Sequence, residues 1–248
     1  MSKYKFLASF GCSFTMGGGL NDERYHRYLN NDYDPESKYD HEKMTYWMTA
    51  HSYPAYLARL MQCNFKNFGI GCGSNAYILK SAYEFCNSLT PEQCQETLVT
   101  VQTSILSRIL LYSADEQMEH TVNSDIHPNP IIAEYYKQYI QHFYDTDWEY
   151  KNLLRNVDLL QTWLRSKNID YVFIGWNGDN KPLPEEYFYK FPGYDGTLSV
   201  FTYDRKLLIS DLKDIPYQDH HLTQYGNELV AEELYKHIKD QHEKFTAI

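Results

Sequence analysis

Three short segments of the 248-residue chain contain residue types that could carry out nucleophilic or acid–base chemistry. The first is Gly-Cys-Ser at residues 11–13, where Ser13 follows a short apolar run. The last is Asp-His-His at residues 219–221, directly before a helical pattern. Histidine accepts and returns a proton near neutral pH, and a neighbouring carboxylate can orient its ring. Taken alone, Ser13 is more simply a helix cap and the two histidines are exposed side chains.

The second segment is rich in glycine and reads Gly-Ile-Gly-Cys-Gly-Ser-Asn at residues 69–75. Glycines at a strand-to-helix turn allow backbone N–H groups to point into a site, as an oxyanion or a phosphate requires. A dinucleotide fingerprint would have the spacing G-x-G-x-x-G and would follow the first strand. This segment has the spacing G-x-G-x-G and follows the second strand, so a nucleotide site is disfavoured. A plain tight turn remains the alternative.

The elements that must position these segments alternate along the chain. Short apolar runs bounded by turn residues predict buried strands at 5–10, 64–68, 97–102 and 171–175. Apolar residues at helical spacing, with a Ser-Tyr-Pro start signal at the first, predict helices at 52–61, 74–85, 150–164 and 223–239. This alternation predicts an α/β fold with a mostly parallel sheet, whose ligands bind at the carboxyl ends of the strands.

We expect one domain spanning residues 1–248, because no linker or repeat divides the chain. Three long segments interrupt the alternation: 17–46, which is polar, 113–147, and 177–211, which is rich in proline, glycine and tyrosine. The middle one contains a helical pattern at 131–144. All three lie where loops would follow strand ends, so we interpret them as insertions over the active-site face. Loops of this length are usually functional or mobile.

Composition excludes several classes of function. The formal net charge is −10 and no Lys/Arg-rich run offsets it, so nucleic acid is not an expected partner. The five cysteines form no Cys-x-x-Cys pair, which favours reduced thiols over a disulfide framework or a zinc ribbon. No signal peptide and no apolar run of about 20 residues is visible, so we expect a cytoplasmic protein outside the membrane. The 24 tyrosines and four tryptophans predict aromatic pockets or an amphipathic surface.

Together the three segments resemble the sequence blocks of the SGNH/GDSL hydrolase family. Gly-Cys-Ser at 11–13 matches the first block, Gly73-Ser-Asn75 matches the second, and Asp219-x-His221-Leu-Thr-x-x-Gly matches the last. The resemblance covers residues 5–85 and about 215–239. It implies a three-layer α/β/α sandwich with a flavodoxin-like sheet, and a bacterial or phage origin is compatible with it.

The resemblance also implies roles for individual residues. Ser13 would be the nucleophile, His221 its base and Asp219 the orienting carboxylate, with Asp214 as the fallback. Gly73 would donate its N–H to the oxyanion. Asn75 would contact substrate. Arg108, just beyond the third block, is a further substrate-binding candidate, for an anionic group, with a structural salt bridge as the alternative.

The chain departs from the family pattern at three places. Cys12 replaces the usual Asp of the first block. The third block, normally Gly-x-Asn-Asp, reads Gln-Thr-Ser-Ile at 102–105, so Ser104 stands where the family has its oxyanion Asn. Thr103 or Gln102 could donate instead. Asp219 lies two residues before the histidine, where the family commonly has three.

The function implied is that of a serine esterase that needs no cofactor or metal. Its expected substrate is a small acyl ester, an O-acetyl group on a carbohydrate. The alternative is an inactive SGNH fold that binds glycans through Trp47, Trp176 and neighbouring tyrosines. A metal site at Asp219, His220 and His221 is disfavoured, because adjacent histidines point in different directions.

Overall fold

The structure is a computed structural model, and the residues it describes are 3–18, 20, 46, 48–113, 118–122, 129–175, 181, 183–191 and 221–246. Most of the predicted insertions 17–46 and 177–211 therefore lie outside the described residues. Among the described helices, none combines the length and the apolar character needed to cross a bilayer.

The centre of the protein is a four-stranded parallel sheet. Its strands are β1 (Phe6–Phe10), β2 (Asn64–Asn67), β3 (Thr97–Gln102) and β6 (Asp170–Ile174), in the order β2-β1-β3-β6. All four lie within a residue or two of the predicted runs, and every pairing is parallel. The α/β prediction is confirmed. Because the strands are parallel, the segments that follow them meet at one edge of the sheet.

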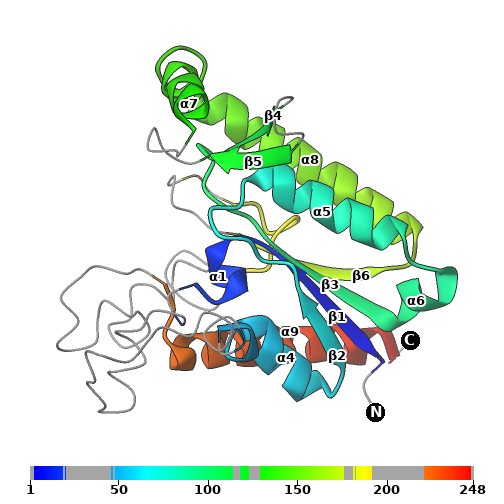
Figure 1. The fold of residues 1–248 in the computed structure, drawn as a ribbon. Coiled ribbons are helices and arrows are strands. Elements are labelled where there is room, and N and C mark those ends of the chain that lie inside the picture. Colours follow the sequence, from blue (N-terminus) through cyan, green and yellow to red (C-terminus); the bar gives the residue numbers. More distant parts are fainter. Residues whose placement is uncertain are drawn as a thin grey trace, which may run out of the picture.

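Helices cover both faces of this sheet (Figure 1). The helices α4 (Tyr53–Met61) and α9 (Gln224–Thr246) pack together on one face, and α5 (Asn75–Asn87) and α8 (Thr146–Ser166) lie on the other. The result is the predicted three-layer α/β/α arrangement. Ser74 caps α5, since its side chain accepts a hydrogen bond from the backbone N–H of Tyr77.

Several elements were not among the predictions. The described residues add a short helix α1 (Ser13–Met16), a helix α6 (Pro91–Glu96) that begins with a Thr90–Gln93 capping box, and an antiparallel pair formed by β4 (Ile109–Ser113) and β5 (Met118–Val122). The strand β4 ends where the predicted insertion 113–147 begins, and β5 and the helix α7 (Pro130–His142) lie within that insertion. The helix expected at 131–144 corresponds to α7.

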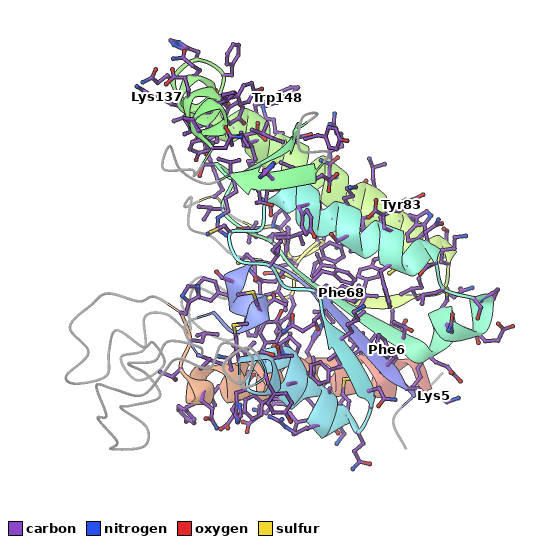
Figure 2. The ribbon with its side chains drawn as sticks, viewed as in Figure 1. Lys5, Phe6, Phe68, Tyr83, Lys137 and Trp148 are labelled. Atoms are coloured by element: carbon purple, nitrogen blue, oxygen red, sulfur yellow. The ribbon has the colours of Figure 1, made fainter. Side chains whose placement is uncertain are left out.

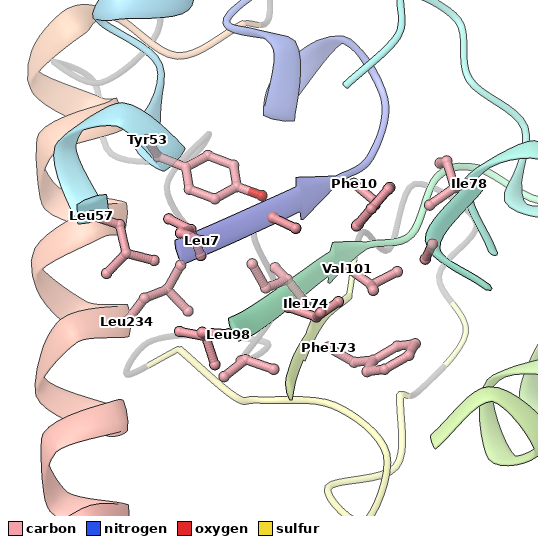
Figure 3. Packing of buried hydrophobic residues seen from close by; sticks show 14 of the residues in the cluster. Leu7, Phe10, Tyr53, Leu57, Ile78, Leu98, Val101, Phe173, Ile174 and Leu234 are labelled. Atoms are coloured by element: carbon pink, nitrogen blue, oxygen red, sulfur yellow. The ribbon is translucent and has the colours of Figure 1, made fainter. Parts of the chain in front are cut away.

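The two faces of the sheet differ in what they bury. On the α5 face, Phe10 stacks on Phe68 with ring centroids 4.6 Å apart, and both rings contact Phe85 of α5. Phe85 also stacks on Phe6, with ring centroids 6.1 Å apart, and Figure 2 labels Phe6 and Phe68 in this layer. On the α4/α9 face, Leu7, Leu57, Leu234 and Tyr53 are all fully buried, and Figure 3 shows them on the same side of the sheet. Polar groups join them there: Thr100 Oγ1 donates a hydrogen bond of 2.7 Å to Ser9 Oγ.

Candidate active site

Ser13 is the first residue of α1, which follows the carboxyl end of β1 (Figure 1). The backbone turns sharply here, and Gly17 ends the helix in the left-handed region at φ 88°. Gly11 must be a glycine at this position. A Cβ on it would lie 2.0 Å from Thr15 Oγ1 and 2.9 Å from Gln102 Oε1. The close packing of α1 against the end of β3 therefore depends on the missing side chain.

The structure brings Ser13 together with His221 from the opposite end of the chain. The His221 Nε2 atom lies 2.8 Å from Ser13 Oγ, within hydrogen-bond distance. The imidazole also packs on Phe14, with ring centroids 4.9 Å apart. Gly18 lies directly behind the ring, since a Cβ there would come within 2.8 Å of Cδ2 and Nε2 of His221. The pair thus has the geometry in which a histidine removes a proton from a serine hydroxyl.

Hydrogen bonds from β3 hold α1 in place. Gln102 Oε1 accepts from Thr15 Oγ1 at 2.9 Å and from the backbone N–H of Cys12 at 3.4 Å. The Gln102 amide N–H₂ donates to the carbonyl of Thr103. Gln102 is completely buried. Its amide oxygen therefore fixes Cys12 and Thr15, which flank Ser13 in the chain, while its amide nitrogen is bonded to the residue that follows it.

The turn after β2 holds the same helix from its other side. Asn67 Nδ2 donates to the carbonyl of Thr15 at 2.7 Å, and Asn67 Oδ1 accepts from the N–H of Gly69 at 2.9 Å. A Cβ on Gly69 would lie 2.4 Å from the backbone nitrogen of Met16, so this loop and α1 are in direct backbone contact. The carboxyl ends of β1, β2 and β3 are thereby joined around Ser13.

Three of the predicted site residues form one cluster after β3. The side-chain amide of Asn75 pairs with the backbone of Ser104: Asn75 Nδ2 donates to its carbonyl at 2.9 Å and Oδ1 accepts from its N–H at 2.7 Å. Arg108 Nη1 donates to Ser104 Oγ at 2.7 Å. Asn75 and Arg108 therefore both contact Ser104, and their predicted contacts with substrate stay predictions.

The other two predicted oxyanion residues have backbone partners. The N–H of Gly73 donates to the carbonyl of Ile70 at 3.1 Å. The N–H and the hydroxyl of Thr103 both donate to the carbonyl of Ile174, at 2.9 Å and 3.4 Å. Ser104 differs from them, because its hydroxyl oxygen accepts from Arg108 and its proton must therefore point elsewhere. The oxyanion roles of Gly73, Thr103 and Ser104 stay predictions.

The salt bridge weighed for Arg108 does not occur within the described residues, where no carboxylate lies within 4.0 Å of its guanidinium. Its Nε atom is buried and has no hydrogen-bond partner there. Asp219, the predicted orienting carboxylate, lies outside the described residues, as do Asp214 and His220. Trp47 and Trp176, named for the glycan-binding alternative, also lie outside them.

Two buried residues near the site were not predicted, Tyr53 and Asn227. The backbone N–H of Tyr53 donates to Asn227 Oδ1 at 2.8 Å, and the Tyr53 hydroxyl lies 3.0 Å from Thr15 Oγ1. Burial raises the pKa of Tyr53 far above the ordinary tyrosine value, so its hydroxyl stays protonated. One signal in the sequence pointed to Asn227. It lies on the same helical stripe as Val230 and Leu234, and a polar residue on an apolar stripe usually has a specific hydrogen-bonding role.

Comparisons with known proteins add little to what the geometry of the site indicates. No protein-family model and no curated protein matches the chain. Among solved structures, one from Desulfitobacterium hafniense DCB-2, described as a lipolytic protein of the G-D-S-L family, aligns with 94% of this chain and 98% of its own. The identity is 14% and the TM-score is 0.34.

Proposed function

We propose that the protein is a serine hydrolase that cleaves a small acyl ester, with Ser13 as the nucleophile and His221 as the base. The observation that carries this proposal is the 2.8 Å contact between His221 Nε2 and Ser13 Oγ, made by residues 208 positions apart. Both lie at the edge of the sheet where the strands end. A lone serine after a strand is most simply a helix cap, but Ser13 lies inside α1 and its hydroxyl faces the histidine.

The reaction follows from this geometry. Ser13 Oγ attacks the ester carbonyl carbon while its proton passes to His221 Nε2. The carbonyl carbon becomes tetrahedral, and the leaving alcohol departs with the proton from His221. Water then gives a proton to His221 and attacks the acyl-serine, which releases the carboxylic acid and restores Ser13. Asp219 would orient the imidazole through its other nitrogen.

The negative oxygen of the tetrahedral intermediate needs hydrogen-bond donors. The N–H of Ser13 is one candidate, because the first residue of a helix has no intrahelical acceptor for it. The Ser104 hydroxyl is the second candidate, since a cationic donor on its oxygen strengthens the hydroxyl as a donor. Thr103 and Gly73 are the remaining candidates. The Gly73 N–H would donate only after leaving the carbonyl of Ile70.

Fluorophosphonate labelling tests the proposal, because these probes react preferentially with activated serines. We expect the natural chain to be labelled, the variant Ser13→Ala to lose labelling, and His221→Ala to lose most of it. Matched controls are Ser88→Ala and His142→Ala, which change an exposed serine and an exposed histidine elsewhere. An unlabelled but folded natural chain would contradict the proposal and favour the alternative, a glycan-binding module.

The substrate is proposed to be an acetyl ester, on a carbohydrate. The support is indirect and comes from the sequence: the segments interpreted as insertions are rich in tyrosine, which stacks on sugars, and contain no apolar lid. Hydrolysis of nitrophenyl acetate, nitrophenyl palmitate and peracetylated sugars separates the substrate classes. Faster turnover of the palmitate than of the acetate would overturn this part of the proposal.

A further inference from the structure

We infer that Tyr53 and Asn227 form a buried bridge that sets the distance between Ser13 and His221, which makes both of them positioning residues for the reaction. The inference rests on the proposed function for its chemical meaning. The bridge itself does not depend on that function, because it concerns only how two segments far apart in the sequence are held at a fixed separation.

The first half of the bridge ends at the nucleophile. Thr15 has one hydroxyl proton, which it donates to Gln102 Oε1. The hydroxyl of Tyr53, 3.0 Å away, must then be the donor to Thr15 Oγ1. Thr15 is two residues after Ser13 in the same short helix, and Tyr53, Thr15 and Gln102 are all completely buried. The ring of Tyr53 lies between α4 and β1 in Figure 3. The tyrosine side chain thus fixes α1 from the α4 side.

The second half ends at the base. The backbone N–H of Tyr53 donates to Asn227 Oδ1 at 2.8 Å. Asn227 Nδ2 donates to the carbonyl of Thr223 at 3.0 Å and to that of Leu222 at 3.4 Å. These two residues come directly after His221, and the Asn227 side chain is 1% exposed. The asparagine therefore ties the first turn of α4 to the segment that carries the histidine.

Tyr53 is the residue common to both halves. Its side chain reaches the nucleophile's helix and its backbone reaches the base's segment, so neither Ser13 nor His221 can shift without disturbing it. Buried hydrogen bonds are maintained because water cannot replace them, and an unsatisfied partner is costly. Proton transfer between serine and histidine depends steeply on their separation, and a misplacement of about 1 Å can cost about 100-fold in rate.

The test compares the bridge with buried polar groups of the same kind elsewhere. The bridge variants are Tyr53→Phe, which removes only the hydroxyl, and Asn227→Leu. The control for the first is Tyr4→Phe, because the Tyr4 hydroxyl is bonded to Asp170 at the opposite end of the sheet. The control for the second is Gln161→Leu, because Gln161 is 2% exposed and donates to the carbonyl of Tyr187.

The measured quantity is the rate of fluorophosphonate labelling at saturating probe. We expect the bridge variants to label at least about 10-fold more slowly, with probe affinity changed less than about two-fold, and the controls to label at the natural rate. If Asn227→Leu fails to fold, Asn227→Asp replaces it; this variant keeps an acceptor for Tyr53 but sets carboxylate oxygens against the two carbonyls. Equal slowing by bridge variants and controls would overturn the inference.

A second comparison separates positioning from general loosening. In the His221→Ala background, the bridge variants should slow the residual labelling no further, because the base they position is gone. Further slowing there would show that they act on something other than the separation of Ser13 and His221, and would overturn the inference.

If the natural chain does not label at all, the proposed function fails and the bridge is tested by NMR. The imidazole ¹H–¹⁵N signal of His221 is assigned by its absence in His221→Ala. It should shift in both bridge variants and stay in place in Tyr4→Phe and Gln161→Leu. An unshifted signal in the bridge variants would contradict the bridge itself.

Discussion

The two faces of the central sheet are built from different chemistry. The α5/α8 face is packed with rings, among them Phe10, Phe68 and Phe173, which attract one another without strict direction. The α4/α9 face adds to its leucines a chain of buried hydrogen bonds through Thr15, Tyr53 and Asn227, described above, which are directional. In the described part of the chain, these hydrogen bonds link the second face to the segments that carry Ser13 and His221. We therefore expect the ring-packed layer to contribute mainly stability and the hydrogen-bonded layer mainly the precise geometry of the site.

The largest effect on stability is expected on the ring-packed face. Phe173, labelled in Figure 3, is 2% exposed and contacts the rings of Tyr171 and Phe188. Phe173→Ala should lower the free energy of unfolding in urea by about 3–5 kcal/mol, since it removes a buried ring and leaves a cavity. The folded fraction should label with fluorophosphonate within about two-fold of the natural rate. A large loss of labelling in fully folded Phe173→Ala would contradict the proposal that the two layers have separate roles.

The largest effect on activity outside the reacting pair is expected at Gly18. A methyl group there would meet the His221 ring at 2.8 Å and the Ser13 carbonyl oxygen at 2.9 Å. Gly18→Ala should therefore push the imidazole away from Ser13 and slow labelling by about 10–100-fold. The matched control is Gly71→Ala, whose Cβ would meet only Met16 Cε at 3.8 Å. Unchanged labelling of Gly18→Ala would contradict the position assigned to the ring.

A smaller effect is expected at Arg108. Arg108→Gln should lower ester turnover by about 10-fold with little change in KM, because the Ser104 hydroxyl loses its charged partner and becomes a weaker donor. Steady-state kinetics with nitrophenyl acetate measure this, and Arg155→Gln, an exposed arginine on α8, is the control. A rise in KM for anionic esters alone would instead support the direct contact between Arg108 and substrate.

No effect on activity is expected from thiol modification, which instead reports how well the ring-packed layer is sealed. Burial raises the pKa of the Cys86 thiol in α5 to about 12, so at pH 8 only about one molecule in ten thousand carries the reactive thiolate. Iodoacetamide at pH 8 should modify exposed Cys72 and leave Cys86 intact, as peptide mass mapping can show. All five cysteines should react in denaturant. Rapid modification of Cys86 in the folded protein would contradict a sealed layer.

Much of the fold could be predicted from the sequence because its signals are local. Short apolar runs located all four strands of the sheet, and the Ser-Tyr-Pro signal located the start of α4. The pair β4–β5 was not found: β5 lies within the segment 113–147 that was interpreted as an insertion, and β4, the apolar run directly before it, was not recognised as a strand. Helix α1 was not found either: four residues are too few to show a helical period.

The candidate site was predictable only in part. Ser13 and His221 could be proposed because their segments, at strand and helix boundaries, together resemble the sequence blocks of a hydrolase family. The roles of Gln102 and Tyr53 could not, because they depend on contacts between segments that the sequence does not place relative to one another. Gln102 was considered as an oxyanion donor, yet its amide holds Cys12 and Thr15.

The most direct test of Ser13 as the nucleophile is to find which atom a fluorophosphonate modifies. The probe is allowed to react with the natural chain, and the product is examined by intact mass and then by tandem mass spectrometry of its peptides. The account predicts one adduct per chain, on Ser13, and none when the chain is unfolded before the probe is added. An adduct on another serine or on a tyrosine would contradict it, as would a folded chain that takes up no probe.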